Sequence, residues 1–185
     1  MKTFSSEKKK VVPRCTGERG LSLIELIVVT AVIALLVSIS LVAFNNYRDR
    51  ASDLRRVAEM TSIQKALELY YITYNKYPDG DFDGCGSWDT GNAMHPLLDG
   101  RSMEPYFGGS KAPVDIWKYS DCEGYRYYRY PAGSYGCPAS RGPYYVLGVT
   151  DMQSSDFPYP GSPGWACGSR DWQNEFDWVV GGYEN

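Results

Sequence analysis

Hydrophobic and polar residues divide this 185-residue chain into three stretches with different patterns. Residues 26–44 form an apolar run that contains no Asp, Glu, Lys, Arg, His, Gly or Pro. These nineteen residues, at about 1.5 Å per residue in a helix, are enough to cross a hydrocarbon core of roughly 30 Å. The pattern therefore predicts a membrane-spanning helix.

The helical signal continues beyond the apolar run. No Gly or Pro occurs from Leu21 to Tyr77, and Pro78 is the first residue that must break a helix. Charged residues appear after Phe44, whereas apolar residues recur mostly every three or four positions. We expect one long helix whose second half, 45–77, carries a one-sided apolar stripe. The residues expected on this stripe are Leu54, Val57, Ala58, Ile63, Ala66, Leu67, Tyr70, Tyr71 and Tyr74.

Residues 78–185 change in composition and predict a different kind of structure. They hold ten of the eleven prolines, most glycines and many Tyr and Trp residues, which favours short strands and long loops. We expect strands at 125–130, 144–149 and 176–180, joined in an antiparallel sheet that covers the helical stripe. The predicted fold class is α+β, with a long N-terminal helix on a small antiparallel sheet.

A single carboxylate, Glu25, lies beside the apolar run and needs a physical reason. A charged side chain within hydrocarbon costs about 2.5–3.5 kcal/mol on insertion scales, so we expect Glu25 to pair with a cation. The preceding flank, 1–20, carries six Lys and Arg against two Glu. This excess places the N-terminus in the cytoplasm and everything after Phe44 outside. A secretory signal peptide would have a shorter apolar core and a small-residue cleavage site, and 44–48 offers none.

The order of these features resembles a known signal. A basic leader, then Gly20, then Leu21 with Glu25 as the fifth residue after the glycine, is similar to the prepilin signal of type IV pilins and type II secretion pseudopilins. The resemblance implies a pilin fold, cleavage after Gly20 by a prepilin peptidase, methylation of Leu21 and assembly with an inner-membrane platform into a filament. It also implies that Glu25 neutralises the amine of a neighbouring subunit.

Under this resemblance the chain has four parts and two successive locations. Residues 1–20 form a leader, 21–44 a transmembrane and filament-core helix, 45–77 its amphipathic continuation and 78–185 the globular head. Before assembly the chain is a single-pass protein of the cytoplasmic membrane, in contact with lipid. It then enters a periplasmic or extracellular filament of its own copies.

Four cysteines lie in the predicted head, Cys85, Cys122, Cys137 and Cys167, whereas Cys15 lies in the leader. An even number of cysteines in loop-rich sequence predicts two disulfides in an oxidising compartment. Four cysteines allow three pairings, which all stay open, and we favour Cys122–Cys137 with Cys85–Cys167. The chain has no CxxC pair and a single histidine, His95, which argues against a zinc site.

An acidic loop after the helix makes calcium the one candidate cofactor. Asp79, Asp81 and Asp83 alternate with other residues and Gly84 comes sixth, as in the first half of an EF-hand loop. The match then fails, because the twelfth position is Thr90 and Asp89 comes one place early. The alternative is an acidic, solvated turn.

Charge and motif content limit the remaining functions. Without residues 1–20 the chain has 13 Lys and Arg against 20 Asp and Glu, a formal charge of about −7, so we expect no strong nucleic-acid binding. No residue stands in the context of a catalytic nucleophile, so we predict no enzyme. Two hypotheses follow: a filament subunit, or a non-polymerising membrane-anchored binding protein. The second would capture a surface ligand such as a glycan with its Tyr/Trp-rich head, including Trp165, Trp172 and Trp178.

Overall fold

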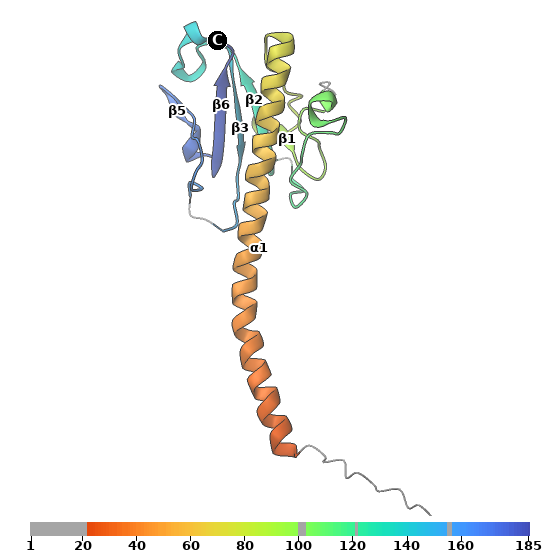
Figure 1. Cartoon of the computed structure of the whole chain (residues 1–185). Coiled ribbons are helices and arrows are strands. Elements are labelled where there is room, and N and C mark those ends of the chain that lie inside the picture. The colour runs from red at the N-terminus through yellow and green to blue at the C-terminus, as the bar shows by residue number, and fades with distance from the viewer. Residues whose placement is uncertain (1–21, 100–102, 121, 155–156) are drawn as a thin grey trace, which may run out of the picture. The chain divides into compact units, whose positions relative to one another are not determined.

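The computed structural model describes residues 22–99, 103–120, 122–154 and 157–185 (Figure 1). It divides into two compact units, Met1–Ala43 and Phe44–Asn185, each of which is described by itself. In chain order the elements are α1 (Leu23–Tyr74), η1 (Cys85–Ser87), β1 (Asp89–Gly91), η2 (Glu104–Phe107), β2 (Tyr125–Tyr130), η3 (Ser134–Gly136), η4 (Ala139–Arg141), β3 (Tyr144–Val149), β4 (Ala166–Cys167), β5 (Arg170–Asp171), η5 (Trp172–Asn174) and β6 (Trp178–Tyr183), where η marks a short 3₁₀ helix. The α+β class with a long N-terminal helix and an antiparallel sheet is confirmed.

Helix α1 ends three residues earlier than the predicted end at Tyr77. Asn75 adopts a left-handed backbone conformation with φ of 54°, and its N–H donates to the carbonyl of Tyr71 at 2.7 Å. Asparagine tolerates this conformation better than most residues, and it is a common end of helices. The helix is therefore stopped by Asn75, before Pro78 is reached.

The main sheet has four antiparallel strands in the order β1-β2-β3-β6 (Figure 1). Strands β2 and β3 coincide with the predicted strands 125–130 and 144–149. Strand β6 lies at 178–183 instead of the predicted 176–180. The short strand β1 and the two-stranded pair β4-β5 were not predicted.

Glycines explain why β6 extends past its predicted end. Gly181 and Gly182 weaken a strand pattern in sequence, because glycine has no side chain to pack. In the structure a Cβ at Gly181 would overlap the ring of Trp165, and one at Gly182 would lie 2.7 Å from the ring of Tyr145. The two glycines therefore let aromatic rings lie directly on the strand.

One hydrophobic core lies between the sheet and the part of α1 that belongs to the second unit. Met60, Ile63 and Leu67 of α1 are fully buried and belong to the same cluster as residues of β2, β3 and β6. The predicted stripe is confirmed for Ile63, Ala66 and Leu67, with Val57, Tyr70 and Tyr71 partly buried against the core. It is wrong for Leu54, Ala58 and Tyr74, which are exposed.

A second core, not predicted, covers the opposite face of the sheet. Its buried members include Trp88, Tyr130, Tyr144, Trp172, Phe176 and Val179. Because both faces are covered, all six residues of β3 are buried. This core is mostly aromatic and is built by the loops that surround β4 and β5.

Two disulfides form in the head, as predicted, but the favoured pairing is wrong. The bonds join Cys85 to Cys122 and Cys137 to Cys167. Cys122 precedes β2 and Cys137 follows it, so the strand itself separates the two residues that we expected to pair. The Cys85–Cys122 bond ties the acidic loop to the start of β2, and Cys137–Cys167 closes the aromatic core.

Candidate functional site

Glu25 lies in the first turn of α1 and contacts the residue that precedes the helix. The backbone N–H of Ser22 donates to Oε2 of Glu25 at 2.8 Å. Ser22-Leu23-Ile24-Glu25 thus has the sequence of a capping box, in which a glutamate satisfies one of the free N–H groups of the first turn. The positive end of the helix dipole also favours a carboxylate there. Gly20 and Leu21, the predicted cleavage and methylation residues, lie outside the described residues.

The apolar half of α1 presents its side chains outward within its own unit. Every residue from Ser22 to Ile39 is exposed, including Leu26, Val32 and Ile39. By length and composition this helix can cross a membrane. Monomeric soluble proteins rarely expose an apolar surface of this extent, which fits a membrane anchor.

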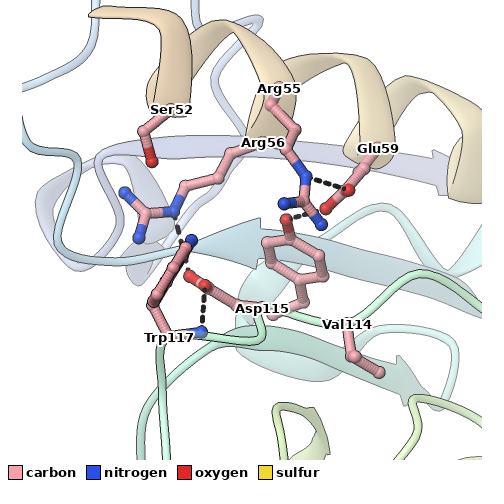
Figure 2. A pocket seen from close by; sticks show the side chains of 8 residues that line it. Ser52, Arg55, Arg56, Glu59, Val114, Asp115 and Trp117 are labelled. Atoms are coloured by element: carbon pink, nitrogen blue, oxygen red, sulfur yellow. Dashed lines mark hydrogen bonds and ion pairs between the residues drawn. The ribbon is translucent and has the colours of Figure 1, made fainter. Parts of the chain in front are cut away.

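A buried ion pair fixes the head loops to α1. Arg56 is 2 % exposed, and its Nε donates to Oδ2 of Asp115 at 2.9 Å (Figure 2). Its Nη1 donates to Oδ1 of Asp53, one turn away on the helix, at 3.2 Å. Asp53 in turn accepts from the backbone N–H groups of Gln153 and Ser154 at 2.8 and 2.7 Å. One helical Asp/Arg pair thereby holds two loops that lie far apart in the sequence.

Sequence reasoning missed this network. Asp53 and Arg56 appear in the sequence as ordinary charges of the polar face, although they occupy the buried side of α1 together with Met60. Their i, i+3 spacing is the only local signal, since Asp115 comes 59 residues after Arg56.

The acidic loop gathers three carboxylates, but not the three that were predicted. Ligand oxygens of Asp81, Asp83 and Asp89 lie within 4.8 Å of one another. Asp79 is drawn away, because it pairs with Nη1 of Arg129 at 3.0 Å and with Nζ of Lys76 at 3.7 Å. Asp89, which comes one place before the twelfth position of the loop motif, is the third member of the cluster instead of Asp79.

Hydrogen bonds and burial shape the electrostatics of this cluster. The fully buried Asp89 accepts from the N–H groups of Asp81 at 3.0 Å and Leu98 at 2.9 Å. Burial, reinforced by the neighbouring carboxylates, raises the pKa of Asp89 to about 7 and also raises that of Asp81. His95 Nδ1 lies 3.4 Å from Oδ2 of Asp83. Clustered carboxylate oxygens suit a hard cation, so calcium binding stays a prediction, now centred on Asp81, Asp83 and Asp89.

The Tyr/Arg strand β2 does not present a platform for bases. Tyr125, Tyr127 and Tyr130 are buried, and Arg129 forms a two-pronged pair with the carboxylate of Glu184 at 2.7 and 2.9 Å. The strand therefore uses its rings for packing and its arginine for tying the C-terminal segment to the sheet.

Comparison with curated proteins gives a relative. Over 100 residues the chain is 25 % identical to the type II secretion system core protein G of Escherichia coli (strain K12), which is a pseudopilin. The alignment covers 54 % of this chain and 67 % of that protein. The resemblance to the pilins and pseudopilins is confirmed. No family model matches the chain, and no solved structure matches it.

Proposed function

We propose that this chain is the structural subunit of a filament of the type IV pilus or type II secretion pseudopilus kind. The observation that carries the proposal is the exposed apolar half of α1, which needs a cover that lipid provides before assembly and other copies provide afterwards. The similarity to a secretion pseudopilin supports the same role.

The proposal gives Glu25 two successive tasks. Within one copy its carboxylate caps the helix through the N–H of Ser22. Cleavage after Gly20 frees the amine of Leu21, and a separate methyl transfer from a methyl donor leaves this amine basic. In the filament the carboxylate of a neighbouring copy pairs with it. A charge in an apolar surrounding is tolerated when it is paired, so this contact fixes the axial position of one copy against the next.

The partners and locations follow from this assembly. A prepilin peptidase removes residues 1–20, an inner-membrane platform assembles the copies, and the basic leader keeps the N-terminus cytoplasmic while the head is outside. The filament then stands in the periplasm or outside the cell. A structural subunit needs no catalytic group, and the pseudopilin relative supports a role that is not enzymatic.

The packing of Trp165, Trp172 and Trp178 argues against their use as a ligand-binding surface in an anchored binding protein. Trp172 is fully buried and Trp178 is 3 % exposed, while Trp165 is partly buried in the second core. These rings hold the head together, so they are not displayed to a surface ligand.

The experiment is to express the full chain in a cell that has a prepilin peptidase and an assembly platform. Mass spectrometry of the mature chain should give an N-terminus at methylated Leu21, and electron microscopy should show filaments that bind antibody to the head. Gly20→Phe should accumulate a precursor that is longer by residues 1–20. A mature wild-type chain that begins at Met1 would refute the proposal.

A further inference from the structure

A cleft of about 240 Å³ lies beside α1 in the second unit. It is lined by Arg48 and Ser52 of the helix, by Trp117 and by Gln153. The last two residues come from the loops that the Arg56 network holds against the helix. Ser52 and Trp117 also line the smaller adjoining hollow that Figure 2 shows, where they lie on either side of the Arg56 guanidinium.

Trp117 is exposed although its loop is firmly held. The side chain of Trp117 is 64 % exposed, and that of Tyr119 is 66 % exposed. The carboxylate of Asp115 accepts from the N–H of Trp117 at 3.2 Å and from Arg56, and the carbonyl of Lys118 accepts from the N–H of Ala93 at 2.9 Å. A large aromatic side chain presented by a rigid loop loses little entropy when it binds, as is typical of residues that dominate protein contacts.

The head segment 78–185 carries a negative net charge, which a positive residue of another copy could contact. Residues 45–77 carry six Lys and Arg against four Asp and Glu, whereas 78–185 carry seven against fifteen. The head segment therefore has a formal charge of −8, whereas the residues that line the cleft carry one charge, the positive charge of Arg48. Arg48 is exposed on the helix and lines the cleft. Exposed carboxylates of the head include Asp171, Asp99, which pairs with Lys111, and Glu175, which pairs with Arg170.

We propose that this cleft binds the acidic head surface of a second copy of the chain, with Trp117 buried at the centre of the contact and Arg48 paired with a carboxylate. Opposite charges attract the two surfaces, and burial of the indole ring supplies the short-range contact. The proposal rests on the proposed function, since it gives the filament a contact between heads in addition to that of the apolar helices.

The test places the photo-crosslinking residue p-benzoylphenylalanine at position 117 of the full chain in assembling cells. We expect a product of twice the subunit mass, with the crosslink in an acid-containing peptide of 78–185 from the second copy. Arg48→Glu should lower the yield about fivefold or more, which is the scale of one significant interface residue. Lys65→Glu makes the same charge change at an exposed position of the same helix and should leave the yield unchanged.

The outcomes separate this proposal from that of the filament. Filaments that form without any crosslink from position 117 to a second copy overturn the cleft proposal and leave the filament proposal standing. A crosslink only to lipid or to a different protein also overturns it. Crosslinked copies in cells that form no filaments support the self-contact, although the proposed filament function then fails.

Discussion

The buried Arg56 gives the most quantitative prediction, because a neighbouring arginine provides a matched comparison. Arg56→Ala removes the donors to Asp115 and Asp53, whose carboxylates are 2 % and 0 % exposed. Asp53 keeps its hydrogen bonds from Gln153 and Ser154, whereas the carboxylate of Asp115 keeps the one from Trp117. Most of the cost therefore comes from Asp115, which is left as a buried charge without a cation.

Removal of one partner of a buried ion pair typically costs about 3–5 kcal/mol, out of a total of about 5–15 kcal/mol for a domain. Arg55→Ala removes the preceding residue of the helix, which pairs with Glu59 at 2.7 Å; the Arg55 side chain is 49 % exposed and that of Glu59 is 19 % exposed. An exposed pair of this kind contributes about 0.3–0.5 kcal/mol. The two variants should thus differ by about 2.5–4.7 kcal/mol.

The assay is urea unfolding of the full chain in detergent, followed by tryptophan fluorescence, since Trp88, Trp172 and Trp178 are buried in the head. The double variant Arg56→Ala/Asp115→Ala should be more stable than Arg56→Ala, because it removes the unpaired carboxylate as well. Equal losses of stability for Arg55→Ala and Arg56→Ala would refute the reasoning. A double variant that is less stable than Arg56→Ala would refute it as well.

Three further predictions concern the head. Asp89 has a folded pKa of about 7, above its unfolded value of 3.8, so its contribution to stability is fully present below pH 4 and is lost as the pH rises through 7. The urea midpoint of the wild-type chain should therefore fall from pH 5 to pH 8, and Asp89→Asn should reduce this slope; an unchanged slope would contradict the assignment. Calcium should raise the unfolding temperature of the wild-type chain more than that of Asp83→Asn, whereas Asp79→Asn should respond as wild type does; an absent calcium effect would leave the cluster as an acidic turn. Replacement of both Cys137 and Cys167 by Ser should destabilise the head by about 2–4 kcal/mol, with the loss seen first in the near-ultraviolet circular dichroism of the second core, and unchanged aromatic signals would contradict this account.

The sequence predicted those parts of the fold that depend on local pattern. Strands β2 and β3 are rich in aromatic and branched residues, although β2 also contains Arg126 and Arg129 and β3 contains Gly148, and their bounds were correct. The end of α1 was missed because only Gly and Pro were considered as helix stops, whereas the helix ends at the left-handed Asn75. The end of β6 was missed because Gly181 looked like a residue that ends a strand. Its lack of a side chain makes room for the ring of Trp165, which comes sixteen residues earlier in the chain.

Long-range chemistry was harder to predict than local structure. Arg56 meets Asp115 across 59 positions, so no periodicity reveals that both are buried. The disulfide pairing depends on which loops meet on the two faces of the sheet, and the second core that brings Cys137 to Cys167 was not expected. In the acidic loop, Arg129 of β2 draws Asp79 out of the cluster, and this contact is known only once the strand is placed beside the loop.

The most direct test of the central idea, that charge at Glu25 joins one copy to the next, compares Glu25→Gln with Glu25→Ala in assembling cells. Both variants should insert in the membrane and lose residues 1–20. The glutamine oxygen can still accept from the N–H of Ser22 and cap the helix, but it carries no charge. The account predicts that neither variant enters filaments. Normal filaments from Glu25→Gln, with none from Glu25→Ala, would contradict it and would reduce the role of Glu25 to capping its own helix.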